Sequence, residues 1–132
     1  AANRINWLVG IVNGTSNFIL TRMRDTQCSF HDAVKEAQVL GYAEADPTLD
    51  VGGFDAAHKL ALLASLAFHT GVTLNDVSCE GITAVTPEDI EAAFAALQAE
   101  LEALLGVPVD VLTPGDLPAC FRAQVLAEAK PV

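Results

Sequence analysis

Four carboxylates and one lysine lie close together near the middle of the sequence. The acids are Glu44, Asp46, Asp50 and Asp55, and the lysine is Lys59. A helix would place Asp55 and Lys59, which are four residues apart, on one face. A lysine beside a carboxylate keeps its charge and can pass a proton to a substrate oxygen, which is acid/base chemistry at a carbonyl. Spacing alone fits a solvated surface ion pair at least as well, and both interpretations stay open at this point.

The element that must position Lys59 is a helix predicted over residues 54–69. It is apolar almost all round, as expected for a buried helix, and its polar residues are mostly in its first two turns. An acidic loop over residues 42–50 precedes it, where Pro47 disfavours helical backbone at Asp46. Calcium binding by this loop is disfavoured, because an EF-hand needs glycine at Leu49 and glutamate at Asp55. The three histidines lack the spacing of a metal triad, so we expect no metal site.

The remaining segments predict an α/β (α+β) domain in which helices pack on a small mixed sheet. Residues 5–12 are continuously apolar and rich in β-branched side chains, which favours a buried strand. A turn over residues 13–16 and a helix to about residue 24 should follow. Further predicted helices are residues 30–40 after the cap Ser29, a helix from Pro87 to Gly106, and residues 122–129. Residues 77–85 fit a short strand or an irregular crossing segment, and residues 107–112 fit an edge strand.

Length and charge narrow the class of protein. The chain has 132 residues, which favours a single domain over residues 1–132. With 17 acidic and 7 basic residues the formal charge is -10, which disfavours nucleic acid and anionic membranes as partners. No apolar run is long enough to span a bilayer and no signal-peptide pattern is present, so we expect a cytoplasmic protein. The widely spaced Cys28, Cys79 and Cys120 are expected to be reduced and mostly buried.

Three long segments resemble the substrate domain of homoserine dehydrogenase in order and spacing, over about residues 4–91. They are GIVNGTSNFILTRM, EAQVLGYAEADPTLDVGGFDAAHKLALLASLAF and EGITAVTPEDI. The resemblance implies an NAD(P)-dependent oxidoreductase that interconverts L-homoserine and L-aspartate 4-semialdehyde, on the route to threonine, methionine and isoleucine. It also implies pairing of this domain in a homo-oligomer. It implies that Lys59 donates a proton to the aldehyde oxygen and that Asp55 acts beside it as a second catalytic residue.

The same resemblance implies the substrate-binding residues. The glutamate at Glu44 would bind the substrate amino group, and Asp50 would be a supporting carboxylate. Thr15 and Gly14 match a turn that lines the pocket, although plain helix capping explains Thr15 equally well.

Two departures from the family pattern limit these expectations. No G-x-G-x-x-G motif occurs, so a nucleotide-binding domain would have to lie upstream, and NAD cannot be distinguished from NADP. We therefore expect the chain alone to bind substrate weakly and turn over poorly or not at all; a non-catalytic scaffold or oligomerisation domain is the alternative. Residues 97–132 resemble the C-terminal end of a minimal nucleotidyltransferase, where Asp110 would match one of three metal-binding carboxylates. The Gly-Ser motif of that family is missing, which disfavours a nucleotidyltransferase fragment.

Overall fold

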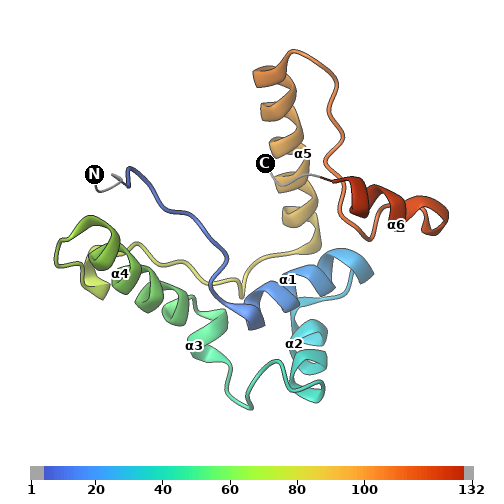
Figure 1. Ribbon diagram of the computed structural model, residues 1–132. Coiled ribbons are helices and arrows are strands. Elements are labelled where there is room, and N and C mark those ends of the chain that lie inside the picture. The colour runs from blue at the N-terminus through green and yellow to red at the C-terminus, as the bar shows by residue number, and fades with distance from the viewer. Residues whose placement is uncertain (1–4, 130–132) are drawn as a thin grey trace. The chain divides into compact units, whose positions relative to one another are not determined.

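Helices are the only regular secondary structure in the part of the chain that the structure describes, residues 5–129 without the side chain of Phe121. In the computed structural model they are α1 (Gly14–Thr26), α2 (Phe30–Val39), α3 (Thr48–Val51), α4 (Phe54–Phe68), the 3-10 turn η1 (Leu74–Asp76), α5 (Pro87–Leu105) and α6 (Ala119–Glu128) (Figure 1). The predicted sheet is therefore wrong, since no strand occurs among these residues.

The two segments predicted as strands lack a neighbour with which to form a ladder. Residues 5–12 are irregular, and Trp7, Val9 and Ile11 are 75%, 81% and 82% exposed. In residues 107–112, Val109 N donates to Glu102 Oε1 of α5 at 3.1 Å, and Val111 N donates to Gln98 Oε1 of α5 at 3.4 Å. Apolar, β-branched composition shows that a segment suits a strand, but it does not supply the partner that makes one.

Contacts divide the chain into two compact units, Ala1–Pro87 and Glu88–Val132. In the second unit, the described residues of α5 and α6 are all at least partly exposed. The core lies in the first unit, which also carries every residue predicted for the active site. The interpretation of residues 1–132 as a single domain stays a prediction.

The core of the first unit is formed where α1 packs against α2. Ile19 and Met23, one turn apart on α1, are fully buried, as are Ala33 and Ala37 on α2. The two alanines let the helices approach closely, because their side chains end at Cβ. Ser29 caps α2 by accepting from Asp32 N at 3.2 Å, as the sequence predicts.

Helix α4 has the predicted extent but not the predicted burial. Ala57 and Ala61 are buried, whereas Leu62 and Leu66 are 67% and 73% exposed. One face of α4 packs within its unit, against α3 and η1. The burial predicted for the whole helix is therefore wrong for its outer face. No helix of the described residues is long and apolar enough to cross a membrane.

All three cysteines are free thiols. Cys28 is half-buried, but Cys79 and Cys120 are exposed, so the prediction of mostly buried thiols is wrong for two of the three.

A close main-chain contact fixes the start of α4. Gly53 has φ of 81°, a conformation that favours glycine, and a Cβ there would lie 2.8 Å from Glu80 O. Residues 77–85 are irregular, which is one of the two predicted alternatives, and Ile82 N donates to Val51 O at 2.8 Å. The segment after η1 therefore rests directly on the α3–α4 junction that carries the candidate site.

We expect Gly81→Ala to destabilise the protein by about 1–3 kcal/mol, the usual cost of overpacking. A Cβ at Gly81 would lie 2.7 Å from Val51 O and 3.0 Å from Gly52 Cα, so that main chain must move. Urea unfolding followed by circular dichroism measures the effect. Gly71→Ala is the matched control, because a Cβ there has nothing within 4 Å. Equal stability of the two variants would contradict the expectation.

Candidate active site

Lys59 Nζ lies between a carboxylate and a main-chain carbonyl. It donates to Asp55 Oδ2 at 2.6 Å, one turn earlier on α4, and to Val12 O at 3.0 Å. An ammonium group has three N–H donors. Among the described residues, two of the N–H groups of Lys59 Nζ have an acceptor. The Lys59 side chain is 48% exposed, and the third N–H of Nζ has no acceptor among the described residues.

Asn13 joins this pair to a second carboxylate. Its Nδ2 donates to Asp55 Oδ2 at 2.8 Å and to Asp50 Oδ1 at 2.7 Å, while its Oδ1 accepts from Ser16 N at 2.7 Å as the cap of α1. Asp50 belongs to α3, whose start is fixed by Asp46 Oδ1 accepting from Thr48 Oγ1 at 2.5 Å. The structure thus brings Asp50, Asp55 and Lys59 together around one amide.

Asn13 was not predicted as part of the site, because its sequence position indicated only a turn before a helix. Asn13 caps α1, a position that its residue type favours, and α1 begins at Gly14, inside the predicted turn. The second function of the amide depends on carboxylates 37 and 42 residues away, which no local pattern relates to it. Spacing along the chain gave no means of finding this bridge.

The other predicted site residues lie outside this hydrogen-bonded group. Thr15 Oγ1 donates to Tyr42 O at 2.8 Å and so ties α1 to the acidic loop. Gly14 begins α1 beside open space. The carbonyl of Glu44 accepts from Gln38 Nε2 at 3.1 Å. The Glu44 carboxylate itself is exposed and has no hydrogen bond or ion pair among the described residues.

The environment of Asp55 favours its charged form. Hydrogen bonds from Lys59, and then from Asn13, lower the pKa of the Asp55 carboxyl below its ordinary value, and they outweigh the opposing effect of partial burial. At neutral pH Asp55 is therefore an anion. It accepts two donors on Oδ2, and Oδ1 is left without a partner among the described residues.

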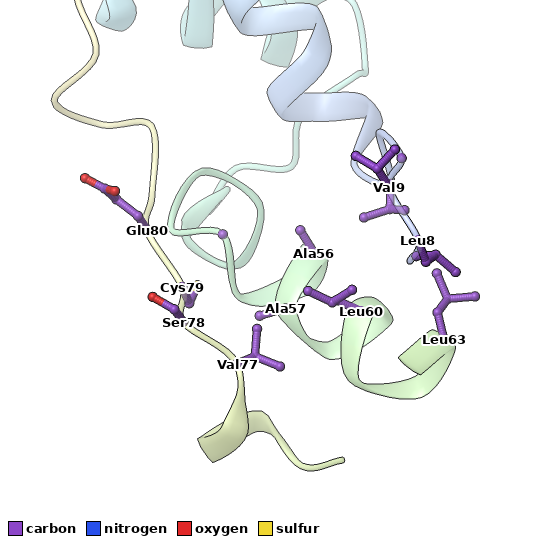
Figure 2. A pocket seen from close by; sticks show the side chains of 13 residues that line it. Leu8, Val9, Ala56, Ala57, Leu60, Leu63, Val77, Ser78, Cys79 and Glu80 are labelled. Carbon is purple, nitrogen blue, oxygen red and sulfur yellow. The ribbon is translucent and has the colours of Figure 1, made fainter. Parts of the chain in front are cut away.

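A pocket of about 300 Å³ is lined by apolar residues of α4 but not by Asp55 or Lys59. Figure 2 shows Ala56, Ala57, Leu60 and Leu63 on the helix, with Leu8 and Val9 on one side and residues 77–80 on the other. Val12, whose carbonyl accepts from Lys59, and Gly53, two residues before Asp55, also line it. Within the described residues, no group of three or more His, Cys, Asp or Glu side chains could hold a metal ion.

Comparison with known proteins gives one family. The family model described as homoserine dehydrogenase matches residues 1–110. The chain belongs to the homoserine dehydrogenase family. The match runs past residue 91, where the sequence resemblance was expected to end, and it includes α5. The resemblance of residues 97–132 to a nucleotidyltransferase stays a prediction.

Sequence similarity to individual homoserine dehydrogenases supports this assignment. The chain is 56% identical over 95 residues to homoserine dehydrogenase of Pseudomonas aeruginosa, which covers 72% of this chain and 22% of the relative. It is 58% identical over 96 residues to that of Corynebacterium glutamicum, covering 73% and 22%. The chain therefore spans about a fifth of the length of these relatives.

Solved structures of the family match the same part of the chain. The crystal structure of Staphylococcus aureus homoserine dehydrogenase at pH 7.5 has a TM-score of 0.61 and 49% sequence identity, and the match covers 65% of this chain and 21% of that one. The enzyme from Thiobacillus denitrificans has the same TM-score with 51% identity, over 67% and 20%.

Proposed function

We propose that this chain is the substrate-binding and proton-transfer part of a homoserine dehydrogenase, which interconverts L-homoserine and L-aspartate 4-semialdehyde with NAD or NADP. The observation that carries the proposal is the placement of Lys59. Its Nζ is held by Asp55 Oδ2 and Val12 O, and one N–H is left for a substrate oxygen. Family membership supports the choice of a small amino-acid substrate.

This geometry supports the following proton step. In the direction of reduction, the third N–H of Lys59 donates to the aldehyde oxygen and gives up its proton as the alcohol forms. The adjacent Asp55 anion stabilises the ammonium form before transfer, and Val12 O fixes the direction of the side chain. In the direction of oxidation, neutral Lys59 accepts the hydroxyl proton. The nicotinamide cofactor, when bound, supplies or removes the hydride.

No residue of this chain is assigned to that cofactor. A dinucleotide pyrophosphate is normally bound by a glycine-rich turn at the start of a helix, and the sequence contains no G-x-G-x-x-G. The residues described here therefore do not fit the nucleotide part of NAD(P). They fit the polar end of a substrate that carries an oxygen and an ammonium group.

A segment exchange tests the proposal. The matching 95 residues of the Pseudomonas aeruginosa enzyme are replaced by those of this chain to give a hybrid enzyme. We expect homoserine-dependent reduction of NAD or NADP by this hybrid, because the exchanged segment carries the proton-transfer residues. The unexchanged enzyme is the reference for activity and for thermal unfolding. A hybrid that unfolds like the reference but reduces neither cofactor would contradict the proposal and favour a non-catalytic scaffold.

A further inference from the structure

Asn13 is buried, with 8% of its surface exposed, and each of its polar side-chain groups is used. Its Oδ1 accepts from Ser16 N, and its Nδ2 donates to Asp50 Oδ1 and Asp55 Oδ2. The orientation of the amide is fixed by its partners, because a main-chain N–H can only donate and a carboxylate can only accept. The acceptor end of the side chain therefore faces α1, and the donor end faces the two acids.

An amide is the group that this position requires. Aspartate would keep the cap on Ser16 N but would place a third carboxylate against the two acids. Serine would also keep a cap, but its hydroxyl oxygen lies at the Cγ position of asparagine, one bond short of Nδ2, so it reaches neither acid. The contact with the two acids can therefore be removed while the cap is kept, so that the position of the acids is tested without loss of the cap of α1.

The bridge reaches Lys59 through one oxygen atom. Asp55 Oδ2 accepts from Asn13 at 2.8 Å and from Lys59 at 2.6 Å, so the amide and the ammonium are held by the same atom. Asp55 follows Gly53 by two residues at the start of α4, where no side-chain cap holds the helix end. The contact with Asn13 thus fixes the carboxylate against α1, from outside its own helix.

We propose that Asn13 is a positioning residue, which holds the Asp55 carboxylate and through it directs Lys59 Nζ toward the substrate. This inference rests on the proposed function for the role of Lys59. The charged or titratable groups that face Asp55 are Lys59 and His58 on α4 and, across the shared amide, Asp50 on α3. Loss of the amide removes a donor to Asp55 and leaves the two acids without a group between them.

The test is a carboxyl titration of the full 132-residue chain by ¹³C nuclear magnetic resonance, without substrate or cofactor. We expect Asn13→Ser and Asn13→Asp both to shift the midpoint of Asp55 to higher pH, with the larger shift in Asn13→Asp. The reason is that each variant loses the donor to Asp55 and the aspartate adds a like charge. Circular dichroism verifies that each variant is helical, and Asp55→Asn identifies the resonance.

The matched control is Ser29→Ala, which removes the cap of α2 but leaves the neighbours of Asp55 in place. It should lower the unfolding temperature and leave the Asp55 midpoint unchanged. Folded Asn13 variants that behave like this control would overturn the proposal, because they would show a structural cap only.

A measurement on the unaltered chain keeps the test decisive if the variants do not fold. The two Nδ2 protons of Asn13 should shift with the Asp55 titration and exchange slowly with water. Chemical shifts of the Asn13 Nδ2 protons that do not change as Asp55 titrates would overturn the proposal. Neither measurement depends on turnover, so an inactive hybrid enzyme with a positive titration would refute the proposed function alone.

Discussion

We expect Lys59→Met to lower kcat of the hybrid enzyme by about 100-fold to 10,000-fold, the usual contribution of a positioned general acid or base. The methionine side chain has a similar length but has no ionisable proton to donate. The bonds to Asp55 and Val12 O are lost with the ammonium group. Steady-state rates of homoserine oxidation and of L-aspartate 4-semialdehyde reduction measure the effect.

Two further variants separate proton transfer from charge and from general damage. Lys59→Arg keeps the positive charge, but a guanidinium does not lose its proton in proteins, so kcat should stay low. Lys35→Met removes an exposed lysine on α2 and should leave kcat unchanged. Full turnover in Lys59→Met would remove this residue from the chemistry and favour the scaffold alternative.

We expect Glu44→Gln to raise KM for homoserine by roughly 10-fold to 150-fold, corresponding to about 1.5–3 kcal/mol for a hydrogen bond to a charged group. The Glu44 main chain is held through Gln38, whereas its carboxylate is exposed without a partner among the described residues. An unpartnered anion next to a fixed main chain suits a substrate ammonium group. Since that contact is the same before and during reaction, kcat should change little.

The matching control uses a substrate instead of a second variant. 4-Hydroxybutyrate is homoserine without its amino group, so its KM should be the same with Glu44 and with glutamine. An equal rise in KM for both molecules would contradict a contact with the ammonium group. It would indicate that the substitution disturbs the loop as a whole.

Local patterns predicted α2, α4 and α5 well, but α3 overlaps the segment predicted as a loop, and α1 begins inside the segment predicted as a turn. Ser29 with Asp32 correctly predicted the start of α2, and Pro87 and Gly106 correctly predicted the ends of α5. Helix caps and helix-breaking residues act within a few residues, so they can be found from local sequence. The strands were wrong, since a strand depends on a partner that can lie anywhere in the chain. The exposed outer face of α4 was missed for a similar reason: an apolar helix shows that burial is favourable without showing what covers each face.

The ion pair of the candidate site could be predicted from the sequence, whereas its wider hydrogen-bonded group could not. Asp55 and Lys59 could be paired because four residues of helix separate them. Their connection to Asp50 passes through Asn13, and that contact exists only once the turn before α1 meets the junction of α3 and α4. The roles of Glu44, Thr15 and Gly14 stay predictions that rest on the family resemblance.

The bond from Lys59 Nζ to Val12 O has a consequence for how this site tolerates mutation. A main-chain carbonyl is supplied by any amino acid, so substitutions at position 12 that keep the chain path do not remove this acceptor. At the next position, by contrast, the acceptor and donors belong to the Asn13 side chain. Substitutions at these two adjacent positions should therefore differ in effect: those at position 12 that keep the chain path preserve the acceptor of Lys59, whereas those at position 13 remove hydrogen-bonding groups. An insertion or deletion between the two positions would displace the Val12 carbonyl from Lys59.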